Sequence, residues 1–333
     1  MRSEIKNSTS NEQLNQLKKP KAVIIVSSKR SGSSFVGEFF NRHPDVYYTF
    51  EPLHTVSDFA SENRLSNKDF LKTSLSVING SFYCDFQNNN IARFASEKFC
   101  VSNLKLYKKQ LCRNGWTPPS EAKIRVWDNE CRKYKMVVIK LIRINYLEDL
   151  RPLLSEIDLE WRIIYLVRDP RPTELSRKGS GRNYDLIRRK GTDRNDEVDL
   201  CETLQRNLKF WVDTPSWLQG RFRMIRFEDI AASPLEKAKE LLEFVGLDLA
   251  DDVANWIKEN TEHEKRSSMK PREFSTSRNT SKVLEAWRLN MDWTLVQRVQ
   301  KVCSVSMRSL GYALMSNLLS LRDLSIPSTL PLS

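Results

Sequence analysis

Two segments of this sequence combine hydroxyl, glycine and arginine groups that suit the binding of an anion. The first, SSKRSGSSF, covers residues 27–35. Its glycine, Gly32, lets the backbone pass close to a bound group, and its serine hydroxyls donate hydrogen bonds. Lys29 and Arg30 add positive charge. If a helix begins after Gly32, its first N–H groups point to the same place, so the segment predicts a phosphate-binding turn.

The second segment, YLVRDPRPTELSR, covers residues 165–177. Arg168 suits a phosphate because a guanidinium group donates two parallel hydrogen bonds. Ser176 follows it by eight residues, which is about two helical turns, so both side chains can face one point. Taken alone, the segment is better explained by a surface ion pair of Arg168 with Asp169 or Glu174.

Both segments follow short apolar runs that predict buried strands. AVIIV at residues 22–26 leads into the first segment, and RIIYLV at residues 162–167 leads into the second. Continuous apolar runs rich in β-branched residues are typical of parallel strands covered on both faces. Similar runs predict further strands at residues 46–50, 136–142 and 223–227.

Helical patterns separate these strands. One helix follows the first segment as far as His43-Pro44, and others are predicted at residues 146–157, 169–177, 197–217, 233–245, 251–260, 283–289 and 295–310. The alternation predicts an α/β fold, a P-loop-like doubly wound parallel sheet flanked by helices. Such sheets bind ligands outside the carboxyl ends of their strands, where both segments lie.

The chain divides into three parts by composition. Residues 1–20 are polar and predict a disordered arm, residues 21–315 predict one domain, and residues 316–333 form a C-terminal tail. Neither the tail nor residues 55–135 show a clear pattern. No apolar run approaches the roughly 18 residues of a membrane-spanning helix, and residues 1–21 lack a signal-peptide core. Read literally, the chain is soluble and untargeted, or it lacks its first segment.

Charge and cysteine content set further limits. The formal net charge of +12 favours anionic partners such as nucleotides, acidic glycans, nucleic acid or anionic membrane. The six cysteines form no CxxC or Cys/His cluster, so no metal site is predicted. Their even number permits disulfides, with reduced, buried cysteines as an equal alternative. Sequons at Asn7, Asn79 and Asn279 permit a secretory-pathway protein.

The first segment differs from the phosphate-binding loop of nucleotide hydrolases. That loop requires Gly-Lys-Ser/Thr, whereas Ser33 follows Gly32 here, and no partner strand ends in an obvious acid for Mg²⁺. A P-loop nucleotide kinase or hydrolase is therefore the alternative and not the main hypothesis. A nucleic-acid-binding protein is less favoured, because the basic residues gather after strand ends and not along a stripe.

Together the two segments resemble the donor-binding elements of sulfotransferases, most closely those of the Golgi carbohydrate 6-O-sulfotransferases acting on galactose, N-acetylglucosamine and N-acetylgalactosamine. In that family a loop like Ser-Ser-x-Arg-Ser-Gly-Ser-Ser-Phe holds the 5′-phosphosulfate of 3′-phosphoadenosine 5′-phosphosulfate (PAPS). Residues 28–35 match it, with Lys29 at the variable place. The family's 3′-phosphate element is similar to Leu166–Arg171 followed by Ser176-Arg177.

The resemblance extends over about residues 22–312. His43-Pro44 and Glu51–His54 match segments that follow the family's loop, and Arg226–Asp229 is similar to a later strand end. Ser275–Asn279 with Trp287-Arg288 resembles a C-terminal segment that closes over the donor, and Cys303 and Leu310–Tyr312 fit the family's end. Two features depart from the family: the N-terminal membrane anchor is absent, and Pro172 and Glu174 are unexpected in the second element.

The resemblance implies a sulfotransferase fold and a PAPS-dependent carbohydrate sulfotransferase without a metal. It implies a glycan acceptor, on a glycosaminoglycan or a glycoprotein, and no nucleic acid. It also implies the Golgi lumen, with membrane attachment only through an anchor that this chain does not show. The residues that it assigns to donor binding are Ser28, Lys29, Arg30, Ser31, Gly32, Ser33, Ser34, Phe35, Arg168, Ser176 and Arg278.

Sulfuryl transfer also requires a base and a group that neutralises the leaving oxygen. We expect Arg30 beside the transferred group and Glu51 as general base, with His54 as the alternative base. The structural alternatives are a Glu51 carboxylate paired with a loop arginine, and His43 and His54 acting as caps or packing residues. Basic residues within 177–194 and 263–278 suit an acidic glycan or form a solvated face. Trp116 and Trp127 are candidates for stacking on sugars or for the core.

Overall fold

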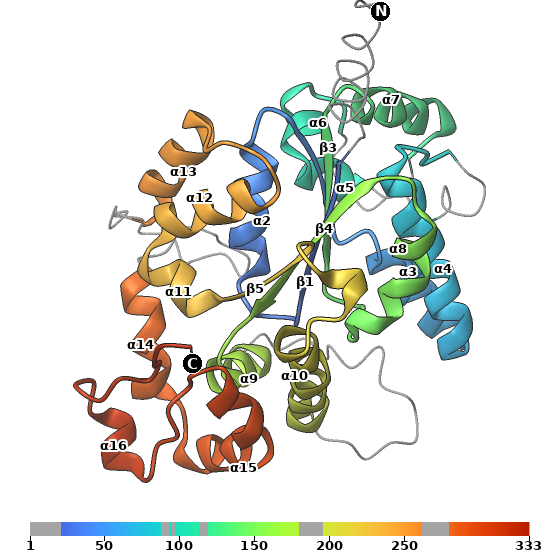
Figure 1. Ribbon diagram of the computed structural model, residues 1–333. Helices are drawn as coiled ribbons and strands as arrows, with labels where there is room; N and C mark the ends of the chain where they lie inside the picture. The colour runs from blue at the N-terminus through green and yellow to red at the C-terminus, as the bar shows by residue number, and fades with distance from the viewer. Residues whose placement is uncertain are drawn as a thin grey trace, which may run out of the picture.

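The computed structural model describes residues 21–87, 94, 97–112, 119–179, 196–261 and 280–332. A parallel five-stranded sheet with the order β2-β3-β1-β4-β5 forms its centre (Figure 1). The strands are β1 (Lys21–Ser27), β2 (Val46–Phe50), β3 (Met136–Leu141), β4 (Glu160–Val167) and β5 (Phe222–Arg226). The predicted α/β fold with a parallel sheet is confirmed.

Each strand contributes to two hydrophobic cores, one on each face of the sheet. Val23 and Ile25 of β1 belong to one core, while Ala22, Ile24 and Val26 belong to the other. All five are buried. Successive side chains of a strand point to opposite faces, so only a continuous apolar run can serve a sheet that is covered on both sides.

One face of the sheet is covered by α2 (Ser33–Arg42), α12 (Pro234–Phe244) and α13 (Asp251–Thr261), on the left in Figure 1. The short α11 (Phe227–Ala232) adjoins them. Phe35, Val36, Phe39 and Phe40 are buried, because their spacing places them on one side of α2. The sequence predicted this helix correctly.

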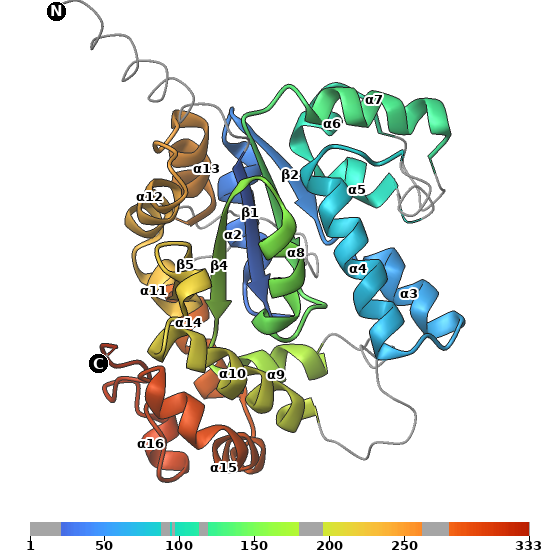
Figure 2. The same cartoon turned by 45° about the vertical axis from the view of Figure 1, so that its right-hand side comes forward.

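The opposite face carries the region for which no structure was predicted (Figure 2). Its helices include α3 (His54–Glu62), α4 (Asn67–Phe82) and α7 (Glu121–Cys131), with the short α5 (Glu97–Ser102) and α6 (Leu104–Lys108) between α4 and α7. The same face carries α8 (Arg151–Glu156), which lies within the helix predicted at residues 146–157. The disulfides Cys84–Cys131 and Cys100–Cys112 tie this region together. Such cross-links stabilise short helices whose apolar pattern is weak.

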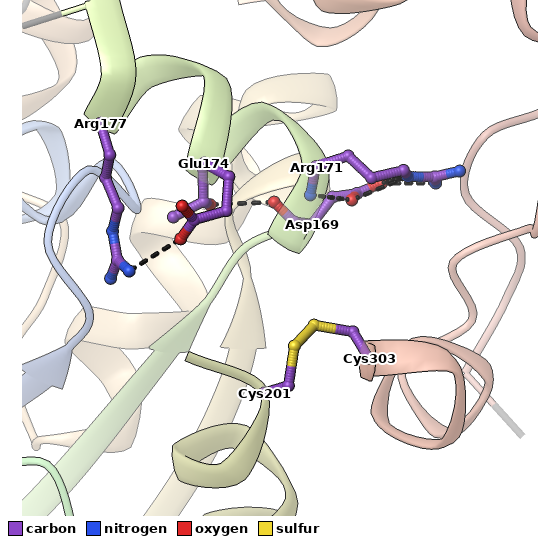
Figure 3. The surroundings of a disulfide bond; sticks show 7 residues. Asp169, Arg171, Glu174, Arg177, Cys201 and Cys303 are labelled. Carbon is purple, nitrogen blue, oxygen red and sulfur yellow. Dashed lines mark hydrogen bonds and ion pairs between the residues drawn. A yellow bond between two sulfur atoms is a disulfide. The ribbon is translucent and has the colours of Figure 1, made fainter. Parts of the chain in front are cut away.

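A third group of helices lies below the carboxyl ends of the strands in Figure 1. It contains α9 (Pro170–Gly179), α10 (Asp196–Val212), α14 (Thr280–Asn290) and α15 (Trp293–Ser309). The disulfide Cys201–Cys303 joins α10 to α15 (Figure 3). All six cysteines are therefore oxidised, and the alternative of reduced cysteines is wrong. No helix in the described part of the chain has the length and apolar character needed to cross a membrane.

The C-terminal tail folds back onto these helices, although its sequence showed no clear pattern. It contains α16 (Leu318–Arg322). Arg288 of α14 is fully buried and donates hydrogen bonds to the backbone oxygens of Leu321 and Ile326. Arg226 does the same with Leu310 and Leu330. The acceptors of these bonds in the tail are backbone oxygens, which every residue has. The side-chain sequence of the tail therefore does not predict that it packs here.

Candidate active site

The turn between β1 and α2 has a left-handed backbone at a position where a side chain would also clash with a neighbouring ring. Gly32, at the N-terminal cap of α2, has φ +85°. A Cβ atom placed there would lie 2.2 Å from the ring of Phe227. Arg30 also adopts a left-handed backbone, with φ 70°. Left-handed backbone at a non-glycine residue is costly and persists where the surrounding structure enforces it, often at a functional site.

The same turn directs polar groups toward one point. Ser33 and Ser34 are the first residues of α2, and N–H groups in a first helical turn have no partner within the helix. The positive end of the helix dipole adds to them. This arrangement suits a phosphate or sulfate group, as the sequence predicted.

The end of β4 lies directly against this turn. Nη1 of Arg168 donates a 2.9 Å hydrogen bond to the backbone oxygen of Arg30. The Arg168 guanidinium also stacks over the ring of Phe227, 4.8 Å from its centre. Phe227 thus packs against both Gly32 and Arg168, and it holds the two strand ends at a fixed spacing.

The expected alternative, an ion pair of Arg168 with Asp169 or Glu174, is replaced by other pairs. Asp169 pairs with Arg171 at 2.6 Å, and Glu174 pairs with Arg177 at 2.8 Å (Figure 3). Both carboxylates are buried. Arg168 itself bonds to the turn through the backbone oxygen of Arg30.

Helix α9 completes the contact between the two predicted segments. Nε of Arg30 donates a 2.9 Å hydrogen bond to Oγ of Ser176. Nε of Arg177, one residue later, reaches the backbone oxygen of Lys29 at 3.4 Å. The bonded residues are 146 and 148 positions apart in the chain, and the structure brings them together.

A buried cluster of charges lies on the other side of the turn. Lys140 of β3 contacts Glu51 at 2.8 Å, and Arg143 contacts the second oxygen of Glu51 at 2.7 Å. Burial opposes ionisation of Glu51, but the charges and hydrogen bonds of Lys140 and Arg143 outweigh it and lower its pKa to about 2. Glu51 also has a left-handed backbone, with φ 46°.

The sequence analysis named neither Lys140 nor Arg143, and Lys140 is the more deeply buried of the two. Its side chain is 1% exposed, and Nζ lies 3.0 Å from Oγ of Ser34. The available signal was a lysine inside the apolar run MVVIKLI, at a position predicted to be buried. A buried lysine requires polar partners, and here they are Ser34 and Glu51.

The two candidate histidines have different surroundings. His54 begins α3, and its Nδ1 lies 3.0 Å from Oδ2 of Asp58, one turn later. His43 is buried: its Nε2 faces the backbone oxygen of Asp248 at 3.1 Å, and burial lowers its pKa. The contacts of His43 are those of a packing residue.

A buried carboxylate supports the second segment from behind. Glu228 accepts hydrogen bonds from the backbone N–H of Asp169 at 3.0 Å and from the hydroxyl of Tyr312 at 2.8 Å. Burial, together with the nearby charge of Asp169, raises the pKa of Glu228 to about 6. Its bond to Asp169 fixes the backbone beside Arg168.

Some predicted residues lie outside the part of the chain that the structure describes. They include the predicted arm of residues 1–20, the segment Ser275–Asn279 with Arg278, and Trp116. The basic residues of the two proposed glycan-binding stretches, other than Arg177 and Lys178, lie outside it too. Trp127 is 2% exposed and belongs to the core, so the core alternative holds for this residue.

Residues 20–311 match the family described as the sulfotransferase domain. The chain belongs to the sulfotransferase family. Carbohydrate sulfotransferase 3 of Mus musculus is 32% identical over 91% of this chain and 70% of its own length. Carbohydrate sulfotransferase 1 of Danio rerio is 30% identical over 91% of this chain and 80% of its own length. These matches confirm the resemblance to carbohydrate sulfotransferases.

Solved sulfotransferase structures are also similar. Mouse sulfotransferase SULT7A1 complexed with PAP is 14% identical, with a TM-score of 0.43, covering 90% of this chain and 89% of that one. As a sulfotransferase, the chain is an enzyme that transfers a sulfuryl group, which disfavours the alternative of a nucleotide kinase or hydrolase.

Proposed function

We propose that this sulfotransferase moves the sulfuryl group of PAPS to a hydroxyl group of a glycan. The names of its relatives support a carbohydrate acceptor. The resemblance of its motifs supports the 6-hydroxyl of galactose, N-acetylglucosamine or N-acetylgalactosamine. A glycosaminoglycan or a glycoprotein glycan would carry that sugar.

One observation carries the assignment of the donor: the turn of residues 28–35 and the segment around Arg168 touch each other. Arg30 bonds to Ser176, and Arg168 bonds to the Arg30 backbone. One nucleotide with phosphates at its 5′ and 3′ positions would span such a pair of anion-binding elements. We assign the 5′-phosphosulfate to the turn, and the 3′-phosphate to Arg168 and Ser176.

The proposed reaction is an in-line displacement at sulfur. The acceptor hydroxyl attacks the sulfur atom, and the bond to the 5′-phosphate oxygen breaks, releasing adenosine 3′,5′-bisphosphate. Alignment of donor and acceptor supplies much of the rate. Arg30, with its backbone held by Arg168, neutralises the leaving oxygen.

Two residues are candidates for the base that removes the hydroxyl proton. Glu51 follows β2 near the turn, but as a base it would have to give up at least one of its two cations, because its pKa is about 2. His54 lies three residues further on, and its Nδ1 is 3.0 Å from Oδ2 of Asp58. Histidine is a common general base. This contrast supports His54 over Glu51.

We further propose that the enzyme works in the Golgi lumen. Cys84–Cys131, Cys100–Cys112 and Cys201–Cys303 are disulfides, which form and persist in oxidising compartments. The resemblance to Golgi enzymes supports the same location. Arg177 and Lys178 at the end of α9 remain candidates for contact with an acidic glycan.

The decisive experiment is transfer of labelled sulfate from PAPS to a panel of acceptors. Keratan, chondroitin and N-acetylglucosamine-terminated glycans form the panel, and mapping of the product identifies the sulfated hydroxyl. Arg168→Ala should lose donor affinity, whereas Arg162→Ala, on the same strand and paired with Glu160, should not. Retention of Mg²⁺-ATP but not of adenosine 3′,5′-bisphosphate would refute the proposal.

A further inference from the structure

A groove outside the proposed donor site lies between the loop that follows β3 and the second half of α10. Its volume is about 360 Å³, within the range of small-molecule sites, roughly 300–1,000 Å³. Aromatic and charged side chains give the groove its chemical character: Tyr146, Glu148, Arg206, Lys209, Phe210 and Asp213. The groove is therefore large enough for a sugar ring, and none of these residues belongs to the donor site.

The two walls of the groove are held together by a buried asparagine, Asn207 of α10. Its Oδ1 accepts a 3.0 Å hydrogen bond from the backbone N–H of Leu147, and its Nδ2 donates a 2.8 Å bond to the backbone oxygen of Asn145. The guanidinium group of Arg206 also stacks on the ring of Tyr146, 3.6 Å from its centre. The groove is thus formed before a ligand arrives, which reduces the cost of binding.

The side chains of the groove suit a ring that carries hydroxyl groups. Tyr146 and Phe210 offer apolar surface to the C–H face of a sugar. Arg206 and Lys209 donate hydrogen bonds, and the two carboxylates accept them. Because a hydroxyl group both donates and accepts, a sugar can use both kinds of partner.

The charges around the groove cancel. Its two cations and two carboxylates sum to zero. Arg151, which contacts Glu148 at 3.2 Å, and Asp149, which interacts with the charge of Arg206, add one charge of each sign. A sulfated or carboxylated sugar would gain little from a site without net charge, so a neutral sugar fits the groove better.

The groove lies close to the place proposed for the reacting sugar. Arg143, in the loop after β3, contacts Glu51 at 2.7 Å. Tyr146 follows Arg143 by three residues, and three residues of extended chain span at most about 11 Å. A glycan whose reacting sugar lies beside Glu51 and His54 can therefore reach the groove with a sugar a few units away.

We infer that this groove is a second subsite for the acceptor, which holds a neutral sugar of the glycan a few units from the sulfated one. The inference rests on the proposed function and adds a contact with the acceptor that the donor site does not provide. It implies that long acceptors bind more tightly than short ones. Binding energy of this kind, equal in the ground state and the transition state, lowers KM and leaves kcat unchanged.

Arg206→Ala tests the subsite with acceptors of two lengths. These are a disaccharide and an octasaccharide of the unsulfated backbone, keratan or chondroitin, that the enzyme sulfates; both backbones contain neutral sugars. Arg223→Ala is the matched control, because Arg223 is also exposed and also stacks over an aromatic ring, that of Phe244. The measurements are kcat and KM for sulfate transfer, and affinity for each octasaccharide by calorimetry with adenosine 3′,5′-bisphosphate present.

Arg206→Ala should raise KM for the octasaccharide about 10-fold, as when one hydrogen bond to a charged group is lost, with kcat unchanged. KM for the disaccharide, and both constants of Arg223→Ala, should stay at the wild-type level. An equal loss with both lengths, or no loss with either, would overturn the inference. So would a difference between the wild type and Arg206→Ala that disappears at high salt, because it would show capture of an anionic sugar.

The binding measurement separates the subsite from the proposed function. If the wild type transfers no sulfate yet binds an octasaccharide through Arg206, the proposed function is wrong and the subsite stands. If it transfers sulfate and Arg206→Ala binds the octasaccharide as the wild type does, the subsite alone is wrong. With neither transfer nor binding, both are refuted.

Discussion

The Nε atom of Arg30 lies 2.9 Å from Oγ of Ser176 and donates a hydrogen bond to it across 146 residues of sequence. Arg30 belongs to the turn proposed for the sulfuryl end of the donor, and Ser176 to the helix proposed for the 3′-phosphate. The bond links the two halves of the site directly. A change at one half should therefore affect the other.

Ser176→Ala tests this link. The variant removes a proposed ligand of the 3′-phosphate and the acceptor of Arg30. Since hydrogen bonds to charged groups contribute about 1.5–3 kcal/mol, affinity for adenosine 3′,5′-bisphosphate should fall roughly 10- to 100-fold in calorimetry. Ser309→Ala is the control, because its exposed hydroxyl bonds only to the backbone of its own helix among the contacts described. Equal affinity of the two variants would contradict the proposed site.

Gly32→Ala should disable the turn. Alanine tolerates φ +85° poorly, and its Cβ would lie 2.2 Å from Phe227. Gly220→Ala is a matched control, with φ +67° and nothing within 4 Å of the added Cβ. Both variants should lose about 1–2 kcal/mol of stability from the left-handed backbone. Only Gly32→Ala should also lose donor binding and further stability, as measured by calorimetry and urea unfolding. A Gly32→Ala enzyme as active as Gly220→Ala would show that the contact with Phe227 is unimportant.

The identity of the base can be read from the pH dependence of kcat/KM. With His54 as base, the rate should rise with pH through the neutral range typical of histidine, as the ring loses its proton. His54→Gln should remove this rise and lower the rate by about 100- to 10,000-fold. Glu51→Gln should keep the rise, because the Glu51 carboxylate is already ionised over that range. The opposite result would assign the proton transfer to Glu51.

Glu228 should make stability depend on pH in an unusual direction. Its pKa rises from 4.5 to about 6 on folding, so the folded state keeps a proton that the unfolded state has lost. Its contribution to stability is full below pH 4.5 and is lost as pH rises through about 6, a change of about 2 kcal/mol.

Glu228→Gln provides the reference for that measurement. In the wild type, the Asp169 N–H and the Tyr312 hydroxyl both bond to Glu228. A glutamine at this position can accept a hydrogen bond from the same N–H and still pair with the hydroxyl. In urea unfolding, the wild type should match the variant near pH 4.5 and be less stable above pH 6. Other groups, including Glu51, titrate alike in both proteins, so their contributions cancel in the difference between the two free energies of unfolding. A constant difference across this range would show that Glu228 does not titrate there.

The sequence by itself determined the local features of this protein. Continuous apolar runs such as residues 22–26 predicted strands buried on both faces, and the structure places each face of β1 in a separate core. Gly32 and the serines around it predicted a turn for an anion. The predicted strands and helix are confirmed because strand burial and helix periodicity depend on neighbouring residues, whereas anion binding by the turn stays a prediction.

Only the tertiary structure decided which distant groups meet. The order β2-β3-β1-β4-β5 places β3 beside β1, so Lys140 reaches Ser34, a contact that no spacing in the sequence reveals. The pairing of Cys201 with Cys303 and the docking of the tail on Arg288 are similar cases. A local pattern states that a residue is buried or polar, but the partner of a buried charge depends on strand order and packing, which only the whole chain specifies.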